Sequence, residues 1–373
     1  MFQSRLLNFD SHGSDYLRAM NPWIQAARLR TLPLALSGIL LGASLSHMCV
    51  SAAILSDSQL ANLSNSGNPI GPESLKLGFH ASPSVIMLLA ILTATALQVL
   101  SNFANDYGDF SKGTDTQANR SDRMLASGKI SEKSMKRAIW FMGIITLMLG
   151  ILLIYISGLF ETPGGFYMLA IGLLALFAAI TYTVGKNAYG YLGLGDLFVL
   201  IFFGLVPVLG MGLLNGLFVN EATCQYLDVF LLAGFGLGLL STAVLNVNNY
   251  RDIPTDKEQN KQTLAVRLGA KKTIVYHRLL LLLGGGLIPM SFLTFEKRYF
   301  EWPEILGLQS VFLIGIFSPI FLLLSSHYQE VKAAEPGDRE TLNPQLKKLS
   351  LTVLAMVLLY VFLAFFILDF FGH

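Results

Sequence analysis

Long apolar runs alternate along the chain with shorter polar connections. Nine of these runs come close to the roughly 20 residues that an α-helix needs to cross the hydrocarbon core of a bilayer. They are predicted at 31–50, 84–102, 138–159, 163–183, 194–218, 229–248, 274–295, 305–326 and 349–370. The pattern therefore predicts an all-α, polytopic transmembrane helical bundle in a lipid bilayer, with about nine spans around a central cavity.

Lys and Arg are distributed unevenly between the connections. Four precede the first run, seven follow the second and six follow the sixth, whereas the alternate loops hold two or fewer. Connections rich in Lys and Arg stay in the cytoplasm during membrane insertion. The N-terminus is therefore predicted to be cytoplasmic and the C-terminus to lie outside.

The composition agrees with a membrane protein. The chain is 53% hydrophobic and 13% charged, whereas a soluble domain carries roughly a quarter charged residues. A net charge of +2 is too small to suggest nucleic acid as a partner. The two cysteines have neither C-x-x-C nor zinc-site spacing, so they are interpreted as packing residues.

Two segments rich in Asn and Asp, 102–109 and 248–256, directly follow membrane-length runs. Ionisable residues beside hydrocarbon are costly, so they usually mark a functional site. Four spans separate the two motifs, so both are expected on the cytoplasmic face, on helices that run in the same direction. We interpret residues 1–373 as a single domain with a possible parallel repeat, 31–183 and 194–326, and an added ninth helix, 349–370.

The spacing of both motifs favours presentation on one helical face. Spacings of three and four residues connect Asn102, Asn105, Asp106 and Asp109 in the first motif, and Asn248, Asp252 and Asp256 in the second. Pro254 either occupies a first helical turn or marks a kink. Mg²⁺ is usually held by one or two carboxylates together with substrate phosphate oxygens. Two such faces across a cavity therefore predict Mg²⁺ ions that clamp a diphosphate.

Basic residues surround both motifs, where they serve either diphosphate binding or membrane topology. The candidates for diphosphate contact are Arg123 and Lys129 after the first motif, and Arg251 and Lys261 around the second. Lys186 is the single basic residue of its short loop, where topology requires little, so a ligand role beside Tyr182 is favoured. Arg28, just before the first run, is either an interfacial anchor or a substrate contact.

These residues resemble the UbiA-type intramembrane prenyltransferases, and among them the branch that acts on 1,4-dihydroxy-2-naphthoate in menaquinone biosynthesis. The most specific stretches are 28–33, 102–115, 182–186, 193–196 and 248–269. In the superfamily pattern N-D-x-x-D-x-x-x-D, Gly113 occupies the final Asp position, and Asp115 follows two residues later, as in the naphthoate branch. Tyr182 and Lys186 match the family's Y-x-x-x-K.

The resemblance implies a Mg²⁺-dependent aromatic polyprenyltransferase of the cell (inner) membrane. Mg²⁺ held by the four motif aspartates would bind polyprenyl diphosphate, and Lys186, Arg123, Lys129 and Arg251 would neutralise the leaving diphosphate. Asn102 would contact the aromatic acceptor or the ion shell. The expected reaction prenylates the naphthoate with loss of CO₂ and gives demethylmenaquinone.

Two kinds of alternative remain open at this stage. Related enzymes share the carboxylate clamp and prenylate 4-hydroxybenzoate, haem or chlorophyllide. A cation-coupled transporter is the alternative outside the enzymes, although transporters place their coupling sites near the bilayer midplane, often within inverted repeats. The acidic residues here fall at predicted cytoplasmic helix ends, and the inferred repeat is parallel. Both features favour the enzyme.

Overall fold

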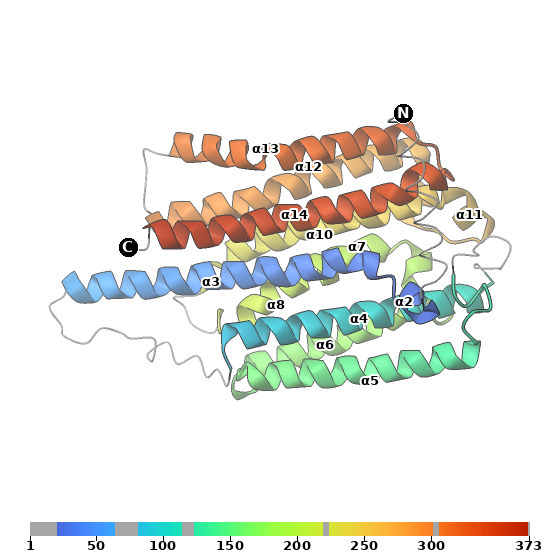
Figure 1. Cartoon of the computed structure of the whole chain (residues 1–373), viewed down its shortest axis with the longest axis horizontal. Coiled ribbons are helices and arrows are strands. Elements are labelled where there is room, and N and C mark those ends of the chain that lie inside the picture. The colour runs from blue at the N-terminus through green and yellow to red at the C-terminus, as the bar shows by residue number, and fades with distance from the viewer. Residues whose placement is uncertain (1–20, 64–80, 114–122, 219–223, 301–305, 372–373) are drawn as a thin grey trace, which may run out of the picture.

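The fold is a bundle of long helices that lie side by side (Figure 1). The computed structural model describes residues 21–63, 81–113, 123–218, 224–300 and 306–371, and these ranges contain helices and no strand. The long helices are α3 (Leu32–Leu63), α4 (Pro83–Ser111), α5 (Glu132–Ile156), α6 (Pro163–Thr181), α10 (Leu227–Arg251), α12 (Leu264–Phe300), α13 (Leu306–Ala333) and α14 (Arg339–Phe371). The predicted all-α polytopic bundle is confirmed.

One further span is built from three consecutive pieces. These are α7 (Gly195–Leu200), the π-helical turn η4 (Ile201–Leu205) and α8 (Val206–Leu214). Eight spans in the described part of the chain are long and apolar enough to cross a membrane. The 28-residue α13 covers most of the remaining predicted run, 305–326.

Short elements connect the spans at the end of the bundle that carries the two polar motifs. They are α2 (Pro22–Ala27), the 3₁₀ turns η1 (Leu29–Thr31) and η3 (Tyr189–Leu192), and α11 (Ile253–Glu258). Helix α4 begins with Pro83, whose missing N–H is no loss in a first helical turn. It continues beyond its apolar run as far as Ser111, and so carries the whole first motif in helical form.

Close helix crossings depend on glycine. A Cβ atom on Gly204 would lie 2.4 Å from the Cα atom of Gly238, so η4 and α10 touch almost backbone to backbone. A Cβ atom on Gly42 would lie 2.8 Å from the carbonyl oxygen of Val208, which brings α3 equally close to α8. Small residues at such crossings are typical of helix packing in membranes.

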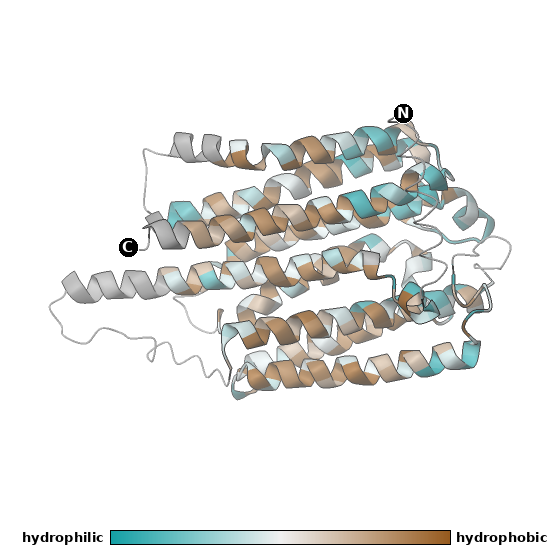
Figure 2. Cartoon of the chain, in the orientation of Figure 1, coloured by the Kyte–Doolittle hydropathy of each residue, from teal (hydrophilic) through white to brown (hydrophobic). Residues whose placement is uncertain are grey.

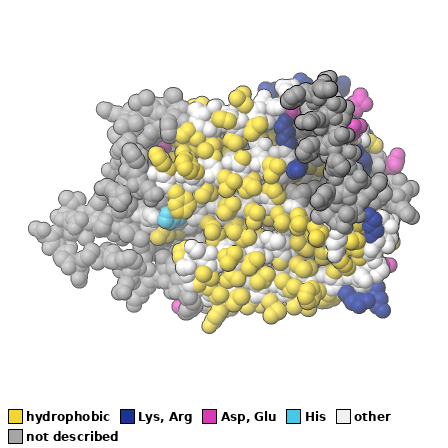
Figure 3. Space-filling view, in the orientation of Figure 1, with side chains coloured by type: hydrophobic (Ala, Val, Ile, Leu, Met, Phe, Trp, Pro, Cys, Tyr) yellow, Lys and Arg dark blue, Asp and Glu magenta, His cyan; other side chains and the backbone are white. Residues whose placement is uncertain are grey.

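Apolar and charged side chains separate along the bundle axis. Hydrophobic residues dominate the middle of the helices, and hydrophilic ones gather at the end where α2 and α11 lie (Figure 2). Lys and Arg side chains gather at that same end (Figure 3). Large apolar side chains such as Trp140, 76% exposed, and Phe177 cover the outer surface of α5 and α6. The chain is therefore a multi-pass membrane protein, and the cytoplasmic location of the basic end stays a prediction.

Candidate active site

A single cavity of about 620 Å³ joins the two Asn/Asp motifs. Its walls come from the α2–η1 turn, α4, α6, the α7–η4 span, α10, α11 and the start of α14. Most of the site residues predicted from the sequence line it: Arg28, Asn102, Asn105, Asp109, Arg123, Tyr182, Asn248, Arg251, Asp252, Asp256 and Lys261. Side chains separated by more than 200 positions in the sequence thus face one space.

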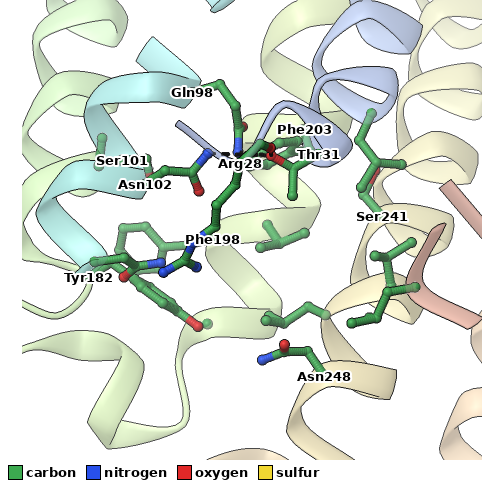
Figure 4. A pocket seen from close by; sticks show the side chains of 18 of the residues that line it. Arg28, Thr31, Gln98, Ser101, Asn102, Tyr182, Phe198, Phe203, Ser241 and Asn248 are labelled. Atoms are coloured by element: carbon green, nitrogen blue, oxygen red, sulfur yellow. Dashed lines mark hydrogen bonds between the residues drawn. The ribbon is translucent and has the colours of Figure 1, made fainter. Parts of the chain in front are cut away.

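Two amide side chains of α4 bind the α2–η1 turn, which leads into the first long helix. Asn102 Nδ2 donates to the carbonyl oxygen of Ala27 at 2.8 Å, and Gln98 Nε2 donates to Thr31 Oγ1 at 3.0 Å. Figure 4 shows these amide side chains directed toward the α2–η1 turn. Arg28 occupies this turn in the left-handed conformation, with φ 48° and ψ 55°. This conformation costs a non-glycine residue about 1 kcal/mol or more, and the Arg28 side chain extends into the cavity (Figure 4).

The two aspartates of the first motif face different surroundings. Asp109 lines the cavity, accepts a hydrogen bond from the Tyr191 hydroxyl at 2.9 Å, and lies 3.5 Å from Arg123 Nη2. Asp106 is 1% exposed and is not among the cavity-lining residues. Its Oδ2 accepts a hydrogen bond from the backbone N–H of Leu125 at 3.4 Å. Asp106 is thus directed toward the turn at 123–127, which covers this part of α4.

In the second motif, Asp252 is held by two guanidinium groups. Arg251 donates to both of its oxygens, from Nε at 2.9 Å and from Nη2 at 2.6 Å. Arg339, the first residue of α14, contributes Nη2 at 3.1 Å from Oδ1. Asp252 also separates α10 from α11, and Pro254 lies in the first turn of α11, where its missing N–H is tolerated.

Lys261 connects the two motifs electrostatically. Its Nζ lies 3.5 Å from Asp256 Oδ1 and 5.3 Å from the centre of the Tyr191 ring, whose hydroxyl is bonded to Asp109. Burial opposes the charge on Lys261, but the carboxylates of Asp109 and Asp256 outweigh it and hold the lysine pKa above its ordinary value. Burial also raises the pKa of Tyr182 to about 12, so its hydroxyl stays protonated at neutral pH.

Apolar and aromatic side chains form the rest of the cavity wall. Phe198, Phe202 and Phe203 come from the α7–η4 span, and small alanines come from α4 and α6. The rings of Tyr189 and Phe198 stack with centroids 3.9 Å apart. The sequence analysis did not select these rings, because in a chain with 26 Phe and 13 Tyr no spacing separates cavity rings from lipid-facing ones.

Three predicted site residues lie apart from the cavity lining. Besides Asp106, these are Lys129 and Lys186, whose side chains are both exposed. Lys186 belongs to the loop that begins with the cavity residue Tyr182. Asp115 lies outside the described residues. The geometry therefore assigns the basic lining to Arg28, Arg123, Arg251 and Lys261, with Arg339 and Lys347 of α14 added.

The oxygen-rich lining fits a hard divalent cation. Within the described ranges, no group of three or more His, Cys, Asp or Glu side chains is placed to bind a metal ion by itself, without ligands from a substrate. Mg²⁺ commonly uses one or two carboxylates and completes its shell with phosphate oxygens and water. Asn105 Oδ1 and Asp106 Oδ1 are buried and have no hydrogen-bond partner within the described ranges. Buried oxygens of this kind beside a carboxylate-lined cavity suit a site that the substrate diphosphate completes.

Comparison with known proteins agrees with the motifs and the cavity. Residues 75–335 match the model of the UbiA prenyltransferase family. The 1,4-dihydroxy-2-naphthoate octaprenyltransferase of Haemophilus influenzae is 41% identical over 69% of this chain and 73% of its own length. The enzymes of the same name from Escherichia coli and Mycobacterium tuberculosis are 35% and 34% identical, over 75% and 71% of this chain and 78% and 76% of their own lengths. The chain therefore belongs to the UbiA prenyltransferase family.

Proposed function

We propose that this protein transfers a polyprenyl chain from polyprenyl diphosphate to 1,4-dihydroxy-2-naphthoate, with loss of CO₂ and diphosphate, to give demethylmenaquinol, the hydroquinone form of demethylmenaquinone. The observation that carries the proposal is the single cavity in which both aspartate motifs meet an aromatic, apolar wall. The relatives named 1,4-dihydroxy-2-naphthoate octaprenyltransferase support the choice of acceptor. The reaction takes place at the predicted cytoplasmic face of the cell (inner) membrane.

The polar end of the cavity binds the donor diphosphate. Asp106, Asp109, Asp252 and Asp256 are the proposed Mg²⁺ ligands, and bound Mg²⁺ supplies positive charge against the diphosphate oxygens. The surrounding basic side chains neutralise charge as the allylic C–O bond breaks and its electron pair leaves with the diphosphate. Arg123, Arg251 and Lys261 line the cavity for this role, and Lys129 and Lys186 are proposed to join them from outside the lining.

The apolar part of the cavity shelters the allylic cation. Stacked rings such as Tyr189 and Phe198 offer negative π faces to a cation, and the apolar walls exclude water that would capture it. The ring carbon that bears the naphthoate carboxylate then forms the new C–C bond, and the carboxylate leaves as CO₂. Arg28, Asn102, Asn248 and Tyr182 are proposed substrate contacts around this step.

An acceptor comparison tests the proposal. Purified protein in lipid nanodiscs receives Mg²⁺, one polyprenyl diphosphate, and either carboxyl-labelled 1,4-dihydroxy-2-naphthoate or 4-hydroxybenzoate, haem or chlorophyllide. Prenylation of the naphthoate with stoichiometric release of labelled CO₂ is expected. Transfer to another acceptor with no naphthoate product would reject the acceptor assignment. Cation flux in liposomes without any prenyl transfer would support the transporter instead.

A further inference from the structure

The last helix contributes a charged wall to the cavity. Arg339, Asn343 and Lys347, each four residues apart on α14, all line it. The match to the family model ends at residue 335, so these side chains lie beyond the matched segment. The sequence analysis assigned no site residue to this helix.

The start of α14 is fastened to the second motif by three hydrogen bonds. The Tyr250 hydroxyl donates to the carbonyl oxygen of Ala334 at 3.0 Å. The backbone N–H of Gly337 donates to the carbonyl oxygen of Arg251 at 2.9 Å. Arg251 Nη1 also donates to Asn343 Oδ1 at 2.6 Å. One backbone bond and two side-chain bonds thus hold the turn before α14 and the first turns of α14 against the end of α10, and this places Arg339 at the cavity.

More positive than negative side chains take part in the ion pairs at Asp252. One carboxylate faces two guanidinium groups, Arg251 on one side and Arg339 on the other. The side chains of Arg251 and Asp252 are only 4% and 8% exposed, whereas that of Arg339 is 36% exposed. Arg251 is therefore confined by its surroundings, and Arg339 is the guanidinium with room to move toward the cavity.

We infer that Arg339 binds the diphosphate of the prenyl donor, exchanging Asp252 for phosphate oxygens as the donor enters. A guanidinium presents five donors in a planar fork, and this geometry suits carboxylate and phosphate equally well. The exchange would also release Asp252 from one of its two cationic partners at the time when Mg²⁺ arrives with the diphosphate. This inference rests on the proposed function, because it assumes a diphosphate donor in this cavity.

A purely structural role for Arg339 predicts the opposite result. If Arg339 only neutralised Asp252, its removal would leave the carboxylate more available to Mg²⁺, and binding of Mg²⁺ with diphosphate would stay unchanged or become tighter. If Arg339 contacts the diphosphate, its removal weakens that binding. The sign of the change in affinity therefore separates the two roles without any measurement of activity.

The test measures binding of inorganic pyrophosphate by calorimetry, with Mg²⁺ present, to the full-length protein in nanodiscs. Arg339→Gln is expected to weaken binding by about tenfold or more, the effect of losing a charge-assisted hydrogen bond. Arg339→Lys should lie between Arg339→Gln and the unchanged protein. The matched control is Arg137→Gln, which removes an exposed guanidinium near the start of α5, outside the cavity, and should bind like the unchanged protein.

Steady-state kinetics give a second, independent readout. Arg339→Gln should raise the KM for polyprenyl diphosphate while the KM for the naphthoate stays within about twofold. Pyrophosphate affinity in Arg339→Gln equal to or tighter than in the unchanged protein would overturn the inference, as would absence of pyrophosphate binding to the unchanged protein. If Arg339→Gln fails to fold, unchanged affinity in Arg339→Lys overturns it. Tight pyrophosphate binding without prenyl transfer would instead reject the proposed function and leave the Arg339 contact standing.

Discussion

Replacing Gly108 by Ala tests whether the close contact between α4 and the loop after α6 sets the geometry of the site. Gly108 lies next to Asp109, and an added Cβ atom would stand 2.4 Å from Thr183 Oγ1 and 2.7 Å from the Thr183 carbonyl carbon. The hydroxyl could rotate away, but the backbone carbon cannot. Because Thr183 follows the cavity residue Tyr182, relief of the clash should shift the loop that holds Tyr182 relative to α4, which holds Asp109.

The expected cost follows from two opposing effects. Overpacking of this kind destabilises a folded protein by about 1–3 kcal/mol. Ala in place of Gly within a helix returns roughly 0.5–1 kcal/mol. Because the clash involves backbone, the overpacking should win, and Gly108→Ala should be destabilised by about 1–2 kcal/mol. The displaced loop should also reduce kcat.

Gly172→Ala is the matched control. Gly172 lies within α6, and nothing approaches an added Cβ atom within 4 Å, so only the gain in helix propensity remains. The two variants should therefore differ by about 1.5–3 kcal/mol, with Gly108→Ala unfolding at the lower temperature in nanodiscs. Equal unfolding temperatures together with equal turnover would refute the argument that this contact positions the site.

The remaining predictions concern topology, metal and leaving-group binding. A reporter placed in the loop 110–135 should be cytoplasmic and one after His373 external, and a cytoplasmic C-terminus would mean that a span was miscounted. Activity should require Mg²⁺ or Mn²⁺ and disappear when a chelator is added. Asp252→Asn should lower turnover by orders of magnitude while the protein stays inserted in the membrane, and full activity of this variant would exclude the metal clamp. Lys186→Ala should reduce prenyl transfer at saturating naphthoate far more than Lys271→Ala, whose loop holds several other cations, and equal rates would assign Lys186 to topology alone.

The aromatic wall of the cavity shows where prediction from the sequence stops. Phe198, Phe202 and Phe203 lie in an apolar run that is predicted only as a span. The π-helical turn at Ile201–Leu205 changes the angular spacing of the side chains at this point. The close contact of Gly204 with Gly238 on α10 sets the position of this π-helical turn. Because the two glycines are far apart in the sequence, no local pattern predicts their contact.

The sequence by itself determined the bundle and the chemistry of its polar end. Apolar runs of membrane length leave the backbone no alternative to helix, since unpaired amides in hydrocarbon are too costly. Repeated carboxylates beside such runs identified the two motifs, and the UbiA resemblance inferred from them was confirmed by the family match. These are local signals, set by a few consecutive residues.

Only the tertiary structure decided which side chains share the cavity. Asp109 and Asp106 are three residues apart on α4, yet one lines the cavity and the other is directed toward the turn at 123–127. Arg339 reaches Asp252 from the far end of the chain. Which face of a helix meets a cavity depends on the angle and depth at which distant helices pack, and this is fixed by contacts between residues that no local pattern connects.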